Sequence, residues 1–239
     1  MTQAVQNPPC VPTIAAPQMP RVSVVDGRTV AHIGRWLASL PDFLNLLDAD
    51  EPWITFTAIE WLERVITPEF RVAEFGSGAS TLYWAKRVAH VVAVEHHAGW
   101  HSKLTDELKE RGVSNCDYIL AEPKPLNGQP AKPYGEFGAF RSLKKGYEDQ
   151  SFEAYASAID SYDDASFDLV FVDGRARVAC AERSISKIKR GGYLVLDNAE
   201  RERYDPLRER LSQYRRIDLT GIGPRQFGTW TTSVWHITG

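Results

Sequence analysis

The chain has 239 residues, 43% of them hydrophobic and 25% charged, and a formal net charge of −3 at pH 7. This composition excludes wholesale disorder, and the length predicts one domain with a substantial core. The slightly acidic balance gives no electrostatic reason to expect a nucleic acid or an anionic membrane as partner. No apolar run approaches the length of a membrane span, the N-terminus shows no signal pattern, and the three cysteines form no CxxC pair. We therefore expect a cytoplasmic protein that binds neither nucleic acid nor membrane.

The N-terminal part of the chain divides into a tail and a helical segment. Residues 1–29 are predicted to be an extended, proline-rich tail, because five prolines fall within the first 20 positions. Residues 30–239 then form a single domain. Its segment 30–66 carries apolar residues at helical spacing, which predicts a helical cover that Pro41 interrupts. A helix over 52–66 ends this cover, with its proline in the first turn.

After position 70, short apolar segments alternate with amphipathic ones, which predicts a mostly parallel sheet with helices on both faces. The predicted strands cover 71–75, 91–95, 116–121, 167–173, 193–197, 216–220 and 229–237. One helix is predicted to end at Gly112 and another at Gly191-Gly192, because glycine favours helix C-termini. No helix separates the last two strands, so they predict an antiparallel hairpin. The predicted fold class is therefore α/β: a doubly wound, mostly parallel seven-stranded sheet with a C-terminal antiparallel hairpin.

The segment 72–81 joins the first of these strands to a helix through a Gly-Ser-Gly turn at 76–78. Ser80 and Thr81 stand where the helix would be capped. Glycines in such a turn let backbone N–H groups approach a ligand closely, at the positive end of the helix dipole. Glu95 ends the neighbouring strand, where a carboxylate can accept hydrogen bonds from both hydroxyls of a ribose. The pattern predicts a site for a nucleotide or a related cofactor.

The order of these features resembles class I S-adenosylmethionine-dependent methyltransferases over residues 52–239. The likeness is carried by Glu74-Phe75-Gly76-Ser77-Gly78 after the first strand, by Glu95 and by the terminal hairpin. The resemblance implies the Rossmann-like fold of these enzymes and S-adenosylmethionine as the cofactor. It also implies transfer of a methyl group to a small-molecule acceptor, with oxygen as the expected acceptor atom.

The same resemblance implies a set of cofactor-binding residues. Glu74 would bind the amino group of the cofactor, directly or through water, or else be a strand-end acid that faces solvent. His96 would lie against the adenine, and Glu122 would contact the adenine amino group. The expected set is Glu74, Gly76, Ser77, Gly78, Ser80, Thr81, Glu95, His96, Glu122 and Asp173.

Two further strands end in acidic residues, Asp173 on one and Asp197-Asn198 on the other. Because the carboxyl ends of parallel strands meet at one edge of a sheet, these side chains are expected to lie close together. They would be hard oxygen ligands for Mg²⁺, and the metal would acidify a hydroxyl acceptor. This arrangement resembles the metal-dependent catechol and caffeoyl-coenzyme-A O-methyltransferases. We therefore assign the three residues as candidate catalytic and metal-binding residues.

The chain departs from that pattern at one position, where Ala176 replaces the lysine that those enzymes typically carry. Arg175 and Arg177 flank it, but arginine stays protonated and is a poor base. The two arginines can instead hold an anionic group of the substrate, and Asp173 can act without a metal. Alternatively, the strand-end acids are simply turn formers.

The segment 122–150 is irregular and is predicted to be a lid insertion, because it follows a strand that ends at the cofactor edge. Its part 134–147 mixes aromatic and basic residues, which suits a planar or anionic acceptor. An ordinary surface excursion is the alternative. Trp230 and Trp235 on the last strand are expected in the core or in the contact of a homo-oligomer.

Two other functions fit parts of the pattern. A nicotinamide-dependent oxidoreductase would use Glu95 in the same way, but its fingerprint requires a third glycine where this chain has Thr81. A cofactor-binding protein without catalytic turnover is the non-enzymatic alternative, and the missing lysine at Ala176 keeps it open.

Overall fold

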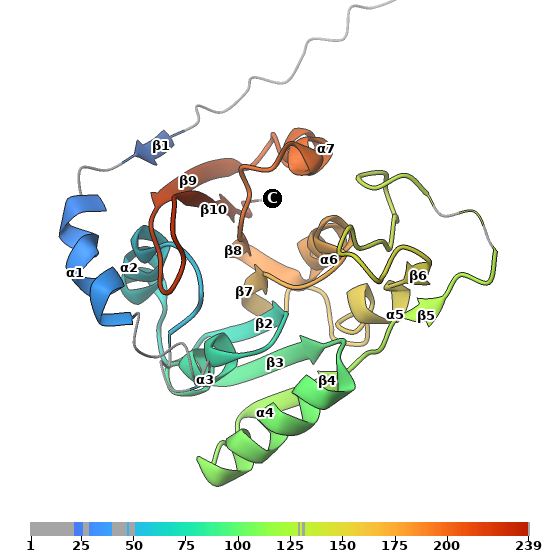
Figure 1. The fold of residues 1–239 in the computed structure, drawn as a ribbon, viewed down its shortest axis with the longest axis horizontal. Helices are drawn as coiled ribbons and strands as arrows, with labels where there is room; N and C mark the ends of the chain where they lie inside the picture. Colours follow the sequence, from blue (N-terminus) through green and yellow to red (C-terminus); the bar gives the residue numbers. More distant parts are fainter. Residues whose placement is uncertain are drawn as a thin grey trace, which may run out of the picture.

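The computed structural model describes residues 22–25, 29–39, 47, 51–128, 130 and 132–238. In this part of the chain one eight-stranded sheet forms the centre of the molecule, in the order β1-β9-β10-β8-β7-β2-β3-β4 (Figure 1). The strands of this sheet are β1 (Val22–Val25), β2 (Arg71–Phe75), β3 (His90–Glu95), β4 (Cys116–Leu120), β7 (Phe167–Val172), β8 (Ile188–Leu196), β9 (Arg215–Gly221) and β10 (Trp230–His236). The helices are α1 (Thr29–Ser39), α2 (Phe56–Val65), α3 (Ala79–Ala85), α4 (Ala98–Glu110), α5 (Glu153–Ala156), α6 (Arg177–Ser184) and α7 (Asp205–Arg210).

The strand pairing confirms the predicted fold class. Strands β4, β3, β2, β7 and β8 run parallel to one another, and β10 lies antiparallel between β8 and β9. One strand was not expected: residues 22–25, assigned to the tail, form β1, which pairs parallel with β9 at the edge of the sheet. The rest of the predicted tail lies outside the described residues.

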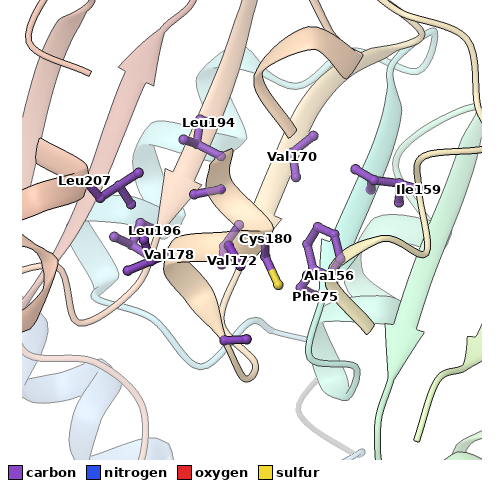
Figure 2. Packing of buried hydrophobic residues seen from close by; sticks show 14 of the residues in the cluster. Phe75, Ala156, Ile159, Val170, Val172, Val178, Cys180, Leu194, Leu196 and Leu207 are labelled. Atoms are coloured by element: carbon purple, nitrogen blue, oxygen red, sulfur yellow. The ribbon is translucent and has the colours of Figure 1, made fainter. Parts of the chain in front are cut away.

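Helices cover both faces of the sheet, as the nearly all-apolar strands require (Figure 1). Helices α2 and α3 pack on one face through Ile59, Leu62 and Trp84, and α4 lies beside α3. Segments around α5, α6 and α7 pack on the other face. Figure 2 shows Val172 of β7 and Leu196 of β8 beside Val178 of α6. Each fully buried aliphatic side chain stabilises the fold by about 1.5–3 kcal/mol.

The second N-terminal helix begins later than predicted. Helix α2 starts at Phe56 because Thr55 caps it: its Oγ1 accepts a hydrogen bond from the N–H of Ala58 at 3.3 Å. Pro52 therefore precedes the helix and is not in its first turn. The interruption predicted at Pro41 lies outside the described residues, where α1 has already ended at Ser39. Among the helices of the described part, none combines the length and the apolar character needed to cross a membrane.

The helix predicted to end at Gly191-Gly192 ends at Ser184, and a single 3₁₀ turn follows it. Ile188 already belongs to β8 and pairs with Phe167 of β7. The two glycines lie inside the strand, where the register between β7 and β8 shifts. Gly191 has a φ of +86°, which favours glycine, so this pair forms a bulge in the strand rather than a helix cap. The apolar spacing that runs on to Ile188 gave no sign of this change.

The segment after β4 is tied to the body of the molecule. Its two ends pair as β5 (Lys124–Pro125) and β6 (Gln150–Ser151). Farther along, the N–H of Phe152 donates to the carbonyl oxygen of Phe140 at 2.8 Å. The segment loops away from β4 and returns beside α5 and α6 (Figure 1). A role as a lid stays a prediction.

Candidate functional site

The two glycines of the predicted turn have different structural roles. Gly76 has a φ of +98°, and a Cβ atom there would lie 2.7 Å from both the Cα and the N of Gly174. No side chain can therefore replace this glycine without moving the backbone. At Gly78 a Cβ would meet only the ring of Trp100, at 3.9 Å, so this glycine leaves space in front of the turn.

This space is a cavity of about 130 Å³, which we call the glycine pocket. Its lining residues are Glu51, Trp53, Gly76, Ser77, Gly78, Ala79, Ser80, Trp100, Asp173, Pro224 and Arg225. The indole N–H of Trp100 donates to the carbonyl oxygen of Ser77 at 2.9 Å and fixes one wall. Five of the predicted cofactor residues line this pocket: Gly76, Ser77, Gly78, Ser80 and Asp173. The place of Trp100 in this wall was not expected from the sequence.

Glu95 lies directly behind the turn and is 3% exposed. Its Oε1 accepts hydrogen bonds from the backbone N–H groups of His96 at 2.8 Å and His97 at 2.7 Å. Its Oε2 accepts one from the hydroxyl of Ser77 at 3.0 Å. Burial alone would raise the pKa of Glu95, but the hydrogen bonds and charge of His96 and the backbone N–H of His97 outweigh it and lower the pKa. Glu95 is therefore a fixed carboxylate, joined to the glycine turn through Ser77.

Glu74 is in a different place from the one predicted. It has no exposed surface, and its two oxygens accept hydrogen bonds from the hydroxyl of Thr81 and from the indole N–H of Trp84. Burial raises the pKa of Glu74 to about 8. Thr81 is also fully buried, and its Oγ1 accepts from the N–H of Gly78 at 3.0 Å. Neither Glu74 nor Thr81 lines the glycine pocket; both join α3 to the strand beneath it.

The two residues expected at the adenine, His96 and Glu122, lie in different surroundings. The ring of His96 packs among aromatic rings, with centroid distances of 5.5 Å to Tyr147, 5.7 Å to Phe152 and 5.9 Å to Tyr155. Glu122 is exposed and is not among the residues that line the glycine pocket. Contact of either residue with an adenine stays a prediction.

Arg177 is the centre of the predicted metal site. Its guanidinium makes five hydrogen bonds, to the carbonyl oxygens of Asp173, Gly174 and Asp197 and to the side chains of Asp173 and Asn198. The bond to Oδ1 of Asp173 is also an ion pair of 2.8 Å. All five N–H donors of the guanidinium can be used in this way. Arg177 therefore joins the turns that follow β7 and β8, and its binding of substrate stays a prediction.

The same arrangement does not fit a magnesium ion. Asp173 and Asn198 face a guanidinium, which would repel a cation. Oδ1 of Asp197 accepts hydrogen bonds from the indole of Trp230 at 2.9 Å and from the hydroxyl of Thr232 at 2.8 Å. Burial and the neighbouring Asp173 raise the pKa of Asp197 to about 7. The described residues also contain no cluster of three or more His, Cys, Asp or Glu side chains that could hold a metal. The structure brings the predicted trio together, but around an arginine rather than around a metal.

A second cavity, of about 370 Å³, opens beside the first at the ends of β7 and β8, and we call it the arginine pocket. It is lined by Tyr134, Ser142, Leu143, Lys144, Gly174, Arg175, Ala176, Arg177, Asn198, Arg201, Arg203 and Tyr204. Arg175 was expected to face substrate; Arg201 and Arg203 were missed. In the sequence these two arginines alternate with Glu200 and Glu202 shortly after Asn198, so no run of basic residues marked them. Asp173 lines one pocket and Gly174 the other, so these two residues form a ridge between the pockets.

Comparisons with known proteins address the fold. A scan against protein-family models and a search of curated proteins found no match. Among solved structures, an rRNA methylase from Streptococcus thermophilus is 15% identical with a TM-score of 0.50, over 75% of this chain and 93% of that chain. A putative methyltransferase from Streptococcus mutans in complex with SAH is 10% identical with a TM-score of 0.48, over 74% and 94%. A methyltransferase-like protein from Silicibacter pomeroyi is 19% identical with a TM-score of 0.48, over 77% and 88%. The first of these likenesses shows that the chain has the fold of a methyltransferase.

Proposed function

We propose that this protein is an S-adenosylmethionine-dependent methyltransferase that acts on a small-molecule acceptor, with oxygen as the methylated atom. The observation that carries the proposal is the link between Gly76-Ser77-Gly78 and Glu95 through the hydroxyl of Ser77. This link supports the proposal because it joins a carboxylate that could bind a ribose to an open glycine turn, at the carboxyl ends of parallel strands, where such folds bind nucleosides.

The charges of the glycine pocket suit this cofactor. Two carboxylates, Glu51 and Asp173, line it together with one cation, Arg225. A sulfonium and an ammonium group are both cationic, so carboxylates nearby would stabilise the methionine part of the donor. The ribose would reach Glu95 once the hydroxyl of Ser77 turns aside. The cavity of about 130 Å³ holds only part of such a molecule, so its wall near Trp53 and Trp100 would have to open further.

Methyl transfer then follows from the positions of the two pockets. An oxygen of the acceptor attacks the methyl carbon, the bond between sulfur and carbon breaks with its electrons going to sulfur, and the acceptor loses a proton. We assign Asp173 as the group that takes this proton, because it lies on the ridge between the pockets and remains 26% exposed. Burial raises its pKa despite the nearby arginines, which makes it a stronger base than an ordinary carboxylate. Asp197 and Asn198 act behind it, as supports of Arg177.

Calorimetric titration of the full chain with S-adenosylhomocysteine and, separately, with NADH tests the proposal. We expect binding of S-adenosylhomocysteine with one site per chain and no binding of NADH. The variant Gly78→Leu should abolish this binding, because its side chain would fill the glycine pocket beside Trp100. Gly34→Leu is the matched control, since a Cβ there meets no atom within 4 Å. Binding of NADH alone would identify an oxidoreductase instead.

A second measurement separates an enzyme from a cofactor-binding protein. Purified protein is incubated with S-adenosylmethionine and a panel of hydroxylated small molecules, and release of S-adenosylhomocysteine is followed. Turnover with at least one acceptor, lost in Asp173→Asn, is the expected result. Tight cofactor binding without turnover on any acceptor of the panel would favour the non-catalytic alternative.

A further inference from the structure

The lining of the arginine pocket is unusual for a chain whose net charge is −3. Four cationic side chains face it in addition to Arg177, namely Lys144, Arg175, Arg201 and Arg203. No aspartate or glutamate is among the lining residues. Arg177 is already neutralised by Asp173. Four cations in one pocket repel one another, and Glu200 beside Arg201 offsets this only in part, so a bound anion would stabilise the arrangement.

Two of these arginines have buried donors without a partner. The Nε atoms of Arg175 and Arg203 are inaccessible to solvent and make no hydrogen bond within the protein. An unsatisfied buried donor costs about 1–3 kcal/mol, and more when the group is charged. Arg201 is 41% exposed and lies 3.8 Å from Glu200, which is beyond hydrogen-bond distance. The guanidinium of Arg201 is therefore available to a ligand, whereas the Nε atoms of Arg175 and Arg203 would reach one only if their side chains turned.

The rest of the cavity limits what this ligand can be. Its volume of about 370 Å³ is in the range of sites for single small molecules. Two aromatic rings, Tyr134 and Tyr204, form part of the wall. The cavity reaches Gly174, next to the proposed base, so a molecule held by its anionic end at the arginines can present another group to the donor methyl. Planar arginine groups pair with the oxygens of phosphate in bidentate geometry.

We infer that the arginine pocket binds a phosphate or sulfate group of the methyl acceptor, so that the acceptor is a small phosphorylated or sulfated molecule with a free hydroxyl. This inference rests on the proposed methyl transfer and adds the chemical class of the acceptor. A carboxylate or a sulfate monoester carries one negative charge, whereas a phosphate monoester carries close to two at neutral pH, so the local positive charge favours phosphate of the two groups.

Binding of phenyl phosphate, phenyl sulfate and phenol to the full chain tests the inference. We expect phenyl phosphate or phenyl sulfate to bind at least tenfold more tightly than phenol, and which of the two binds better identifies the group. Arg175→Gln and Arg201→Gln should each weaken this binding at least tenfold. Arg190→Gln is the matched control, because Arg190 is exposed and does not line the pocket. Thermal unfolding of each variant checks the fold, and Arg201 is exposed enough for its variant to fold normally.

The outcomes separate this inference from the proposed function. The anion site would be overturned if phenol bound as tightly as both anions, or if Arg190→Gln weakened anion binding as much as the pocket variants do. Binding of S-adenosylhomocysteine would still support the methyltransferase proposal in that case. Anion binding without S-adenosylhomocysteine binding would overturn the proposed function. A single-stranded RNA oligonucleotide is tested as well. If this RNA binds more tightly than phenyl phosphate and the same variants lose its binding, the ligand of the arginine pocket is a nucleic acid rather than a small molecule.

Discussion

The glycine pocket and the arginine pocket lie on either side of one ridge, Asp173-Gly174, yet they differ in charge and in hydrogen bonding. The first is lined by two carboxylates, and the groups that shape its turn are already bonded to one another, as Ser77 is to Glu95. The second has cations without acids, and two of its donors have no partner. The hydrogen bonds of the glycine pocket are already formed, which suits a ligand that is the same in every turnover, such as the methyl donor. The unsatisfied donors of the arginine pocket indicate a group that belongs to the acceptor.

The largest expected effect concerns the ridge, which both pockets share. Arg177→Met removes the five hydrogen bonds that join the turns after β7 and β8 and leaves Asp173 without its ion pair. We expect a loss of about 3–5 kcal/mol in the free energy of unfolding, measured in urea. Both S-adenosylhomocysteine and phenyl phosphate should bind more weakly. Arg175→Met, which removes no ion pair with a described residue, should lose less than about 1 kcal/mol, and similar losses in the two variants would contradict the role of Arg177.

The second prediction concerns the close contact between Gly76 and Gly174. Gly76→Ala places a Cβ against the backbone of Gly174 and also strains a residue with positive φ. We expect a loss of about 3 kcal/mol in the free energy of unfolding. Gly112→Ala is the control for backbone strain alone, since its φ is +66° and no atom lies near its Cβ, and it should lose about 1 kcal/mol. If both variants lose the same free energy of unfolding, backbone strain explains the requirement for glycine at position 76, and the close approach of the two turns does not.

The third prediction separates the pockets. Glu95→Gln keeps the shape of the side chain but removes the charge that holds the N–H groups of His96 and His97. We expect the affinity for S-adenosylhomocysteine to fall about tenfold, or about 1.4 kcal/mol, while the affinity for phenyl phosphate stays unchanged. Calorimetry with both ligands on the same protein sample measures this. A parallel loss of both affinities would show that the two pockets are not independent.

The last prediction is a pH dependence that sets Glu74 apart from Glu95. The pKa of Glu74 in the folded protein is about 8, above its unfolded value, so the folded state binds more protons than the unfolded state between about pH 4.5 and pH 8. Stability should therefore fall as the pH rises through this window, by at most about 1.4 kcal/mol per pH unit. Glu74→Gln mimics the neutral acid and should flatten the dependence. Urea unfolding at pH 6, 7 and 8 compares the slopes, and identical slopes would contradict a neutral Glu74.

Much of this molecule follows from local sequence patterns. The apolar segments determined the strands, and the absence of a helix before the last strand determined the antiparallel hairpin, because both depend on residues close together in the chain. The same holds for the glycine turn and for Glu95 at the end of β3, since a strand and its following turn are set by a few consecutive residues. The bulge at Gly191-Gly192 was misjudged because the apolar spacing before it suits a helix as well as a strand.

Only the tertiary structure decided what the charged groups do. The sequence places Asp173, Asp197 and Asn198 near one another, but it does not say whether a metal or Arg177 neutralises them. The answer depends on the side chain of Arg177, the first residue of α6, which points back between the ends of β7 and β8. Burial made Glu74 a neutral acid, whereas the hydrogen bonds and charge around the likewise buried Glu95 keep it a carboxylate, although the two lie on neighbouring strands. The charge state and the partners of an ionisable side chain depend on distances across the fold. Such distances cannot be predicted from the spacing of residues along the chain.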